Sequence, residues 1–215
     1  MSSFGVLQTV VAATCIDHAV EAHFTSSSDV NLIVGRASLL QVFRLNERSD
    51  DGNNAALCLL HRIEEATDED AQREVATNLL GPLWCARAAI PYMRTAGRGD
   101  IVNISSESVR LPFPYLTLYA ATKAGLETFS EGLRSEVRGY GIRVTVLRSG
   151  NVAGGEIARN WDDDHRAQFF ETIQKTGHAA FAGQAISPET TARALINALS
   201  LPAEANVDMI EVRAI

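Results

Sequence analysis

Hydrophobic residues recur every three or four positions between residues 118 and 137, and this spacing predicts a long amphipathic helix. The repeating positions are Leu118, Thr122, Leu126, Phe129, Leu133 and Val137. Side chains at such intervals fall on one face of a helix with 3.6 residues per turn. Gly139 and Gly141 follow, and glycine commonly ends a helix. The pattern therefore predicts a helix that ends close to residue 138.

Other segments alternate between strand and helix signals. Short runs rich in aliphatic residues predict strands at 100–105, 142–147 and 207–212. Helical patterns cover 68–95, with an expected kink at Gly81-Pro82, then 162–174, and 188–201 with Ser187 as its N-cap. Strands that alternate with helices predict an α/β fold, with a Rossmann-like parallel sheet covered by helices on both faces.

The first 50 residues have a different character. Two short β-rich runs, Val30–Val34 and Leu39–Leu45, flank Gly35–Ser38 and predict a β-hairpin. Residues 46–54 are polar and rich in turn formers, as expected of a junction. We therefore expect an atypical N-terminal segment at 1–50 and an α/β domain at 51–215.

Composition narrows the class of protein. The chain has 215 residues, of which 46% are hydrophobic and 21% charged, so we expect one folded domain. A net charge of −7 argues against nucleic acid as a partner. Three scattered cysteines form no disulfide or zinc pattern, and no apolar run reaches the roughly 18 residues of a membrane span. We expect a cytoplasmic protein without a membrane partner.

Tyr119 and Lys123 are the first candidates for chemistry. They are four residues apart on the predicted helix, so their side chains share one face. A neighbouring cation lowers the pKa of a phenol, as general acid–base catalysis requires. Ser106 ends the strand before this helix, where ligands bind in open α/β sheets. The Tyr–Lys pair alone is more typical of an exposed aromatic residue with a lysine one helical turn later.

The wider motif resembles the short-chain dehydrogenase/reductase family from about residue 53 to the C-terminus. The stretch IVNISSESVRLPFPYLTLYAATKAG is similar to the family's strand, catalytic serine, substrate loop and catalytic helix. TNLLGPLWCARAAIPYM contains Asn78 at the position of the family's helix asparagine, and Asn53-Asn54-Ala55 matches the family's Asn-Asn-Ala-Gly turn 25 residues earlier.

This resemblance implies an oxidoreductase that uses NAD or NADP on a small carbonyl or secondary alcohol. Tyr119 would exchange the proton, Ser106 would polarise the same oxygen, and Lys123 would lower the pKa of the tyrosine and hold the nicotinamide ribose. Asn78 would fix a water in a proton relay. The coenzyme contacts implied by the resemblance are Asn54, Ala55, Lys123, Gly150 and Val152. It also implies a homo-oligomer, and no metal.

The coenzyme cradle departs from the family pattern. The glycine-rich turn that lets the backbone approach the pyrophosphate is missing, and only 52 residues precede Asn53. Each strand–helix–strand unit takes roughly 30 residues or more. Ala56 replaces the turn glycine, Ser149-Gly150 replaces the family's Pro-Gly, and Gly154 replaces a threonine. We therefore expect an incomplete or replaced N-terminal half.

Residues 18–46 leave two interpretations open. VEAHFTSSSDVNLIVGRASLLQVFRLN resembles the first propeller blade of the large subunit of the cleavage and polyadenylation specificity factor, and more loosely its damaged-DNA-binding relatives. A single blade cannot bury its face without neighbours. The alternative is a divergent edge of the dehydrogenase sheet, with the hairpin supplying strands.

Three functions follow from these patterns: an NAD(P)-dependent oxidoreductase, a non-catalytic pseudoenzyme or oligomerisation remnant, and a fragment of an RNA-processing scaffold. The acidic run Asp162–His165 is interpreted as a helix start and not as a metal site. Trp161, Phe169 and Phe170 are candidates for a substrate pocket or for plain core packing. Glu107 is expected to be a solvated loop charge.

Overall fold

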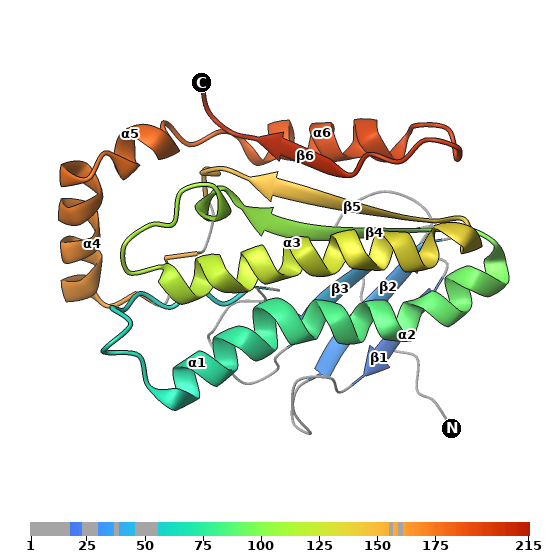
Figure 1. Cartoon of the computed structure of the whole chain (residues 1–215), viewed down its shortest axis with the longest axis horizontal. Coiled ribbons are helices and arrows are strands. Elements are labelled where there is room, and N and C mark those ends of the chain that lie inside the picture. Colours follow the sequence, from blue (N-terminus) through green and yellow to red (C-terminus); the bar gives the residue numbers. More distant parts are fainter. Residues whose placement is uncertain (1–17, 23–29, 37–38, 46–55, 155–156, 159–160) are drawn as a thin grey trace.

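The strands of the protein form one mixed sheet, with helices packed on it (Figure 1). The computed structural model describes residues 18–22, 30–36, 39–45, 56–154, 157–158 and 161–215. Within these residues the strand order is β1-β2-β3-β4-β5-β6. The strands are β1 His18–Ala22, β2 Val30–Arg36, β3 Leu39–Leu45, β4 Gly99–Ser106, β5 Ile142–Ser149 and β6 Met209–Val212. The helices are α1 Asp68–Val75, α2 Gly81–Ala96, α3 Thr117–Val137, α4 Asp163–Lys175, α5 His178–Ala182 and α6 Pro188–Leu199.

The strands β3, β4, β5 and β6 run parallel, as the alternation of strands and helices predicts. Ser106 at the end of β4 pairs with Ser149 of β5, which in turn pairs with Val212 of β6. The carboxyl ends of these strands therefore meet at one edge of the sheet. In open α/β sheets this edge is where ligands bind.

The predicted hairpin is confirmed. Strands β2 and β3 pair antiparallel over their whole lengths, and β1, which the sequence pattern does not predict, pairs antiparallel with β2. Leu39 and Leu40 of β3 pair with Asp100 and Ile101 of β4, so the hairpin continues the parallel sheet formed by β4, β5 and β6. This pairing agrees with the interpretation of the segment as a divergent sheet edge.

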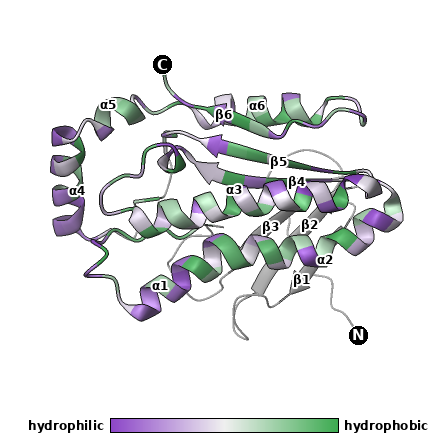
Figure 2. Ribbon diagram, in the orientation of Figure 1, coloured by the Kyte–Doolittle hydropathy of each residue, from purple (hydrophilic) through white to green (hydrophobic). Residues whose placement is uncertain are grey.

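The helices α2 and α3 cover one face of β4 and β5 (Figure 1). Their packing buries a core cluster that includes Ile101, Leu133, Val137 and Val144. Colouring by hydropathy shows that β5 is hydrophobic along most of its length, whereas the first turn of α1 is hydrophilic (Figure 2). On the opposite face of β4, Ile104 remains 45% exposed. On this face, the helix cover expected from the sequence leaves the end of β4 around Ile104 open to solvent.

The predicted helix 68–95 is interrupted by a π-helical turn, Ala76–Leu80. This turn lies directly before the expected kink at Gly81-Pro82. Pro82 lies in the first turn of α2, and because proline has no N–H, one backbone hydrogen bond is missing directly after the π-helical turn. Single π-turns inserted into α-helices are frequent at functional sites. Here the π-helical turn carries Asn78.

Side-chain caps fix where three helices begin. Thr67, Asp162 and Ser187 each accept a hydrogen bond from a backbone N–H in the first turn of the following helix, α1, α4 and α6 respectively. Asp162 also contacts Nδ1 of His165 at 2.6 Å. The acidic run therefore begins α4, as predicted, and in the described ranges no cluster of three or more His, Cys, Asp or Glu side chains is placed to hold a metal.

Candidate active site

Tyr119 and Lys123 lie on the inner face of α3, one helical turn apart. Both are buried, with 6% and 4% of their surface exposed. The Lys123 ammonium is 5.6 Å from the centre of the Tyr119 ring and donates a hydrogen bond of 2.9 Å to the carbonyl oxygen of Ile104. Because Ile104 belongs to β4, this bond ties the inner face of α3 to the strand that carries Ser106.

Ser106 completes the arrangement from the end of β4. Its side-chain oxygen accepts a hydrogen bond from the backbone N–H of Ser108, and its hydroxyl is near enough to the Tyr119 phenol to lower the pKa of that phenol. A strand-end hydroxyl, a phenol and an ammonium therefore meet at the carboxyl edge of the sheet. The structure brings these three sequence-predicted residues together.

Burial sets the ionisation of this group. Removal from water raises the pKa of Tyr119 above that of a free phenol, and the nearby Cys58 adds to the rise, while the Ser106 hydroxyl opposes it. Burial also lowers the pKa of Lys123 to about 8. We expected Lys123 to lower the pKa of Tyr119, but the net direction in this structure is upward, because desolvation of the phenolate dominates.

The side chain of Asn78 links residue 57 to the start of α3. Its Oδ1 accepts from the N–H of Leu57 at 2.8 Å, and its Nδ2 donates to the Leu57 carbonyl at 2.7 Å and to Thr122 Oγ1 at 3.1 Å. Thr122 in turn donates to the carbonyl oxygen of Tyr119 at 2.7 Å. The side chain of Asn78 thus fixes residue 57 and the first turn of α3, and both N–H groups of its amide are used in these bonds.

An apolar cluster closes over Tyr119 from the side of α4. The Trp161 indole donates a hydrogen bond of 3.0 Å to the carbonyl oxygen of Cys58 and stacks edge-on against Phe169 at 5.2 Å. The buried members of this cluster are Cys58, Leu60, Phe113, Tyr115, Leu116, Tyr119, Trp161, Phe169 and Ile173. Phe170, by contrast, is 50% exposed. Of the three aromatic candidates, Trp161 and Phe169 are placed beside the site.

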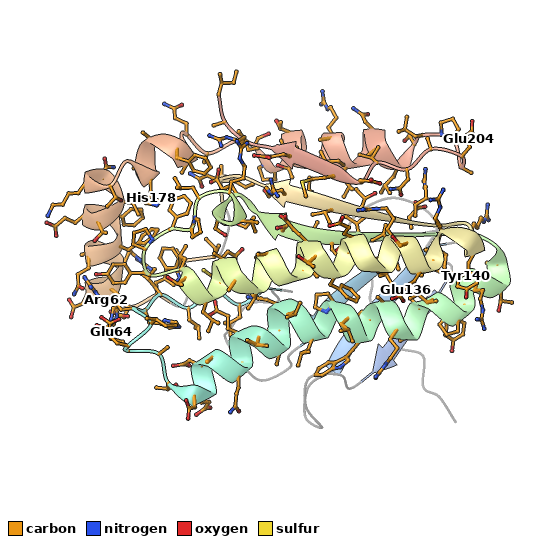
Figure 3. All side chains as sticks on the ribbon, in the orientation of Figure 1. Arg62, Glu64, Glu136, Tyr140, His178 and Glu204 are labelled. Carbon is orange, nitrogen blue, oxygen red and sulfur yellow. The ribbon has the colours of Figure 1, made fainter. Side chains whose placement is uncertain are left out.

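The loop that leads into α3 is held from both sides. Arg62 lies 5.2 Å from the centre of the Tyr115 ring, and the His178 ring lies 5.3 Å from that of Phe113. Figure 3 shows Arg62 and Glu64 beside α4, and His178 at the start of α5. Tyr115 has a φ of 67°, which is unfavourable for a residue with a Cβ. The contacts of this loop stabilise that backbone close to Tyr119.

The expectation that Glu107 is a solvated charge is wrong. Its side chain is 6% exposed, and burial raises the pKa of the carboxyl, which Arg213 and the N–H of Asn151 partly offset. The residue follows Ser106 directly, at the point where β4, β5 and β6 end together. Sequence position alone could not show this, because the burial depends on strands that are distant in the chain.

The predicted coenzyme residues are placed only in part. Gly150 follows β5, and its N–H donates 2.8 Å to the carbonyl oxygen of Val212. A Cβ at this position would come within 2.8 Å of the Arg213 Cβ, so the close approach requires glycine. Val152 forms an isolated bridge with Ile186. Asn54 and Ala55 lie outside the described residues.

Sequence reasoning missed Glu74, which lies one turn before Asn78 and is fully buried. Its Oε1 accepts a hydrogen bond of 3.2 Å from the N–H of Leu59, and its Oε2 has no partner in the described structure. Burial raises the pKa of this carboxyl to about 7. The available signal was its spacing of four residues from Asn78.

Comparisons with known proteins agree with this geometry. The model of the short chain dehydrogenase family matches residues 52–166. The NADP-dependent 3-hydroxy acid dehydrogenase of Salmonella typhi is 34% identical over 163 residues, covering 74% of this chain and 62% of that protein. The 3-ketodihydrosphingosine reductase of Bacteroides thetaiotaomicron is 37% identical over 103 residues, covering 48% of this chain and 38% of the reductase.

Solved structures show the same fold. The closed form of a serine dehydrogenase complexed with NADP⁺ superposes with a TM-score of 0.63 at 29% identity, covering 74% of this chain and 62% of that one. The propeller resemblance of residues 18–46 finds no support in these comparisons. The match to the family model and the meeting of Ser106, Tyr119 and Lys123 at one sheet edge lead to one assignment: the chain belongs to the short-chain dehydrogenase family.

Proposed function

We propose that this chain is an NAD(P)-dependent oxidoreductase that interconverts a carbonyl and a secondary alcohol. Tyr119 exchanges the proton with the substrate oxygen, Ser106 hydrogen-bonds the same oxygen, and Lys123 supplies the adjacent positive charge. Asn78 positions these groups through Leu57 and Thr122. The observation that carries the proposal is the convergence of a buried phenol, a buried ammonium and a strand-end hydroxyl at one edge of the sheet.

The ionisation of the site favours the reductive direction at neutral pH. With its pKa raised by burial, Tyr119 holds its proton, so it is ready to donate to the oxygen of a carbonyl substrate. Lys123, with a pKa of about 8, is mostly charged at pH 7 and stabilises the phenolate that the donation leaves behind. Oxidation of an alcohol needs the phenolate first, and is therefore favoured by higher pH.

Lys123 also fits the ribose of a nicotinamide coenzyme. An ammonium has three donors, and in the described structure one of them bonds to Ile104. A buried ammonium with donors to spare suits the vicinal hydroxyls of a ribose. The coenzyme, when bound, supplies or accepts the hydride. The aligned region covers 62% of the Salmonella typhi relative, so activity of the whole protein is itself part of the proposal.

The surroundings of Tyr119 indicate an apolar substrate. Phe113, Trp161 and Phe169 pack on the side of Tyr119 that faces α4, and aromatic walls recognise hydrophobic groups. We therefore propose a ketone or alcohol with a hydrophobic substituent. The names of the relatives differ in substrate, from hydroxy acids to a sphingoid ketone, and do not decide between these classes.

The test is a titration of the purified chain with NADPH and NADH, followed by the fluorescence of the reduced nicotinamide. We expect saturable binding of at least one coenzyme, weakened by Lys123→Met, with Lys175→Met as the control because Lys175 lies on the exposed surface of α4. Absence of saturable binding up to millimolar concentration would remove the proposal, whatever the geometry around Tyr119.

The alternative is a non-catalytic member of the family, and one observation favours it. The glycine-rich pyrophosphate turn is absent from the sequence, and Ala56 stands where the Asn-Asn-Ala turn of the family ends in glycine. A chain that cannot hold the pyrophosphate would keep the fold without turnover. Tight coenzyme binding in the titration would exclude this alternative.

A further inference from the structure

Glu74 presents a chemical problem that the proposed reaction does not explain. It is a carboxyl in the interior, fully buried on the inner side of α1, with one oxygen bonded to Leu59 and the other without a partner in the described residues. A buried carboxyl that is not fully hydrogen-bonded costs free energy. Such a group in an active-site wall is unexpected unless its oxygen atoms serve the site.

Glu74 and Asn78 both form hydrogen bonds to the backbone of residues 57–59. Asn78 bonds both the N–H and the carbonyl of Leu57, and Glu74, one turn earlier, accepts from the N–H of Leu59. Between Leu57 and Leu59 lies Cys58, whose carbonyl oxygen accepts a hydrogen bond from the indole N–H of Trp161. The segment 57–59 is thus bonded on one side to Glu74 of α1 and Asn78 of the π-helical turn. On the other side it bonds to Trp161, which belongs to the apolar cluster around Tyr119.

The charged and titratable groups that face Glu74 come from three elements. Asp70 lies one turn earlier on α1 and raises the pKa of Glu74, as does burial, while the N–H of Leu59 lowers it; the result is about 7. Cys58 belongs to the segment 57–59, and its thiol interacts with both Glu74 and Lys123. Tyr119 faces Glu74 from α3, and a negative charge on Glu74 raises the pKa of the phenol.

We propose that Glu74 is a positioning residue: with Asn78 it clamps the segment 57–59 on which Trp161 docks, and its protonation state controls how that segment and its aromatic cover are held. When Glu74 is neutral, the carboxyl sits in its apolar surroundings without an unpaired charge. When Glu74 ionises, its negative charge is buried beside Tyr119, and Oε2 has no hydrogen-bond partner in the described residues. The segment 57–59 then shifts to reduce the cost of burying this charge. The role of the segment as a wall of the active site rests on the proposed function, but the clamp itself does not.

The indole N–H of Trp161 reports the clamp without coenzyme or substrate. The chain has two tryptophans, so a ¹H–¹⁵N spectrum of Trp84→Phe identifies the Trp161 resonance. We expect this resonance to shift with pH in one step with a midpoint near 7, the pKa of Glu74. In Glu74→Gln, which keeps the acceptor for Leu59 but cannot ionise, we expect the step to vanish.

Two further variants keep the outcome decisive. Glu69→Gln removes an exposed carboxylate from the same helix and should leave the step unchanged. Glu74→Leu removes the acceptor for Leu59, and we expect the Trp161 resonance to be displaced at every pH. A step near pH 7 that survives in Glu74→Gln would overturn the proposal. An unaltered Trp161 resonance in a folded Glu74→Leu would overturn it as well. Failure of coenzyme binding would leave this result intact, so the two proposals fail separately.

Discussion

At the scale of single residues, burial decides the chemistry more than sequence spacing does. The interval of four residues correctly predicted that Tyr119 and Lys123 share a helix face. It could not predict the direction in which the pKa of Tyr119 moves, because that depends on how Trp161 and Cys58, distant in the chain, shield the phenol from water. Glu74 and Glu107 were missed or misread for the same reason: a carboxylate is exposed in most contexts, and only the fold shows that these two are not.

The pKa of Glu74 makes stability depend on pH. The folded chain raises this pKa from 4.5 to about 7, so it binds the proton more tightly than the unfolded chain does. The resulting stabilisation is fully present below pH 4.5 and is lost as the pH rises through 7. Glu74→Gln never ionises, so relative to the native chain it should gain about 2 kcal/mol in free energy of unfolding between pH 5 and pH 8.

Urea unfolding of both proteins at the two pH values measures this difference. The same comparison for Glu69→Gln controls for a change in surface charge on α1, where we expect little dependence on pH. An equal difference between Glu74→Gln and the native chain at pH 5 and pH 8 would show that Glu74 has the same pKa in the folded and unfolded states.

At the scale of elements, the sequence predicted most helices and strands, and the failures have local causes. The stripe from Leu118 to Val137 and the caps Asp162 and Ser187 located α3, α4 and α6 within a few residues. The short helix α5 lacks both a side-chain cap and a repeating pattern, so no signal marks it. The sequence predicts a kink at Gly81-Pro82, because glycine and proline commonly interrupt helices. It gives no sign of the π-helical turn itself, whose Asn78 bonds to Leu57, 21 residues away in the chain.

Substitution by alanine should change the stability of the protein in opposite directions at Gly150 and at Gly132. At Gly150, after β5, an added Cβ would lie within 3.0 Å of the Arg213 backbone, so Gly150→Ala should strain the contact between β5 and β6 and destabilise the protein by about 1–3 kcal/mol. At Gly132, inside α3, nothing lies within 4 Å, and Gly132→Ala should stabilise it by about 0.5–1 kcal/mol. Thermal unfolding of both variants checks the pair; destabilisation by Gly132→Ala, or none by Gly150→Ala, would contradict the packing described here.

At the scale of the whole molecule, the chain joins a part that matches the short-chain dehydrogenase family to N-terminal strands that lie outside the family match. The parallel strands β4–β6 and the helices α1–α3 reproduce the family fold, as the resemblance implied. The antiparallel strands β1–β3 extend that sheet where the resemblance offered no template. The hairpin could be predicted from Val30–Leu45, but its pairing with β4 could not, because strand order is set by contacts between segments far apart in the sequence.

No helix within the described ranges is long and apolar enough to cross a membrane. The candidate site lies at the carboxyl edge of the sheet. Ser106 at the end of β4 and Tyr119 and Lys123 in the first turns of α3 form its described part.

The proposal that Tyr119 donates the proton to a carbonyl substrate is tested most directly by the rate of NADPH oxidation. This rate is measured with a panel of hydrophobic ketones for the purified native protein, Tyr119→Phe and Tyr92→Phe. Tyr92 is 80% exposed on α2 and serves as the control. We expect ketone-dependent oxidation in the native protein and in Tyr92→Phe. In Tyr119→Phe we expect the rate to fall by at least about 100-fold, because general acid catalysis contributes about 10²–10⁴-fold. Oxidation at the native rate in Tyr119→Phe would contradict the proposal.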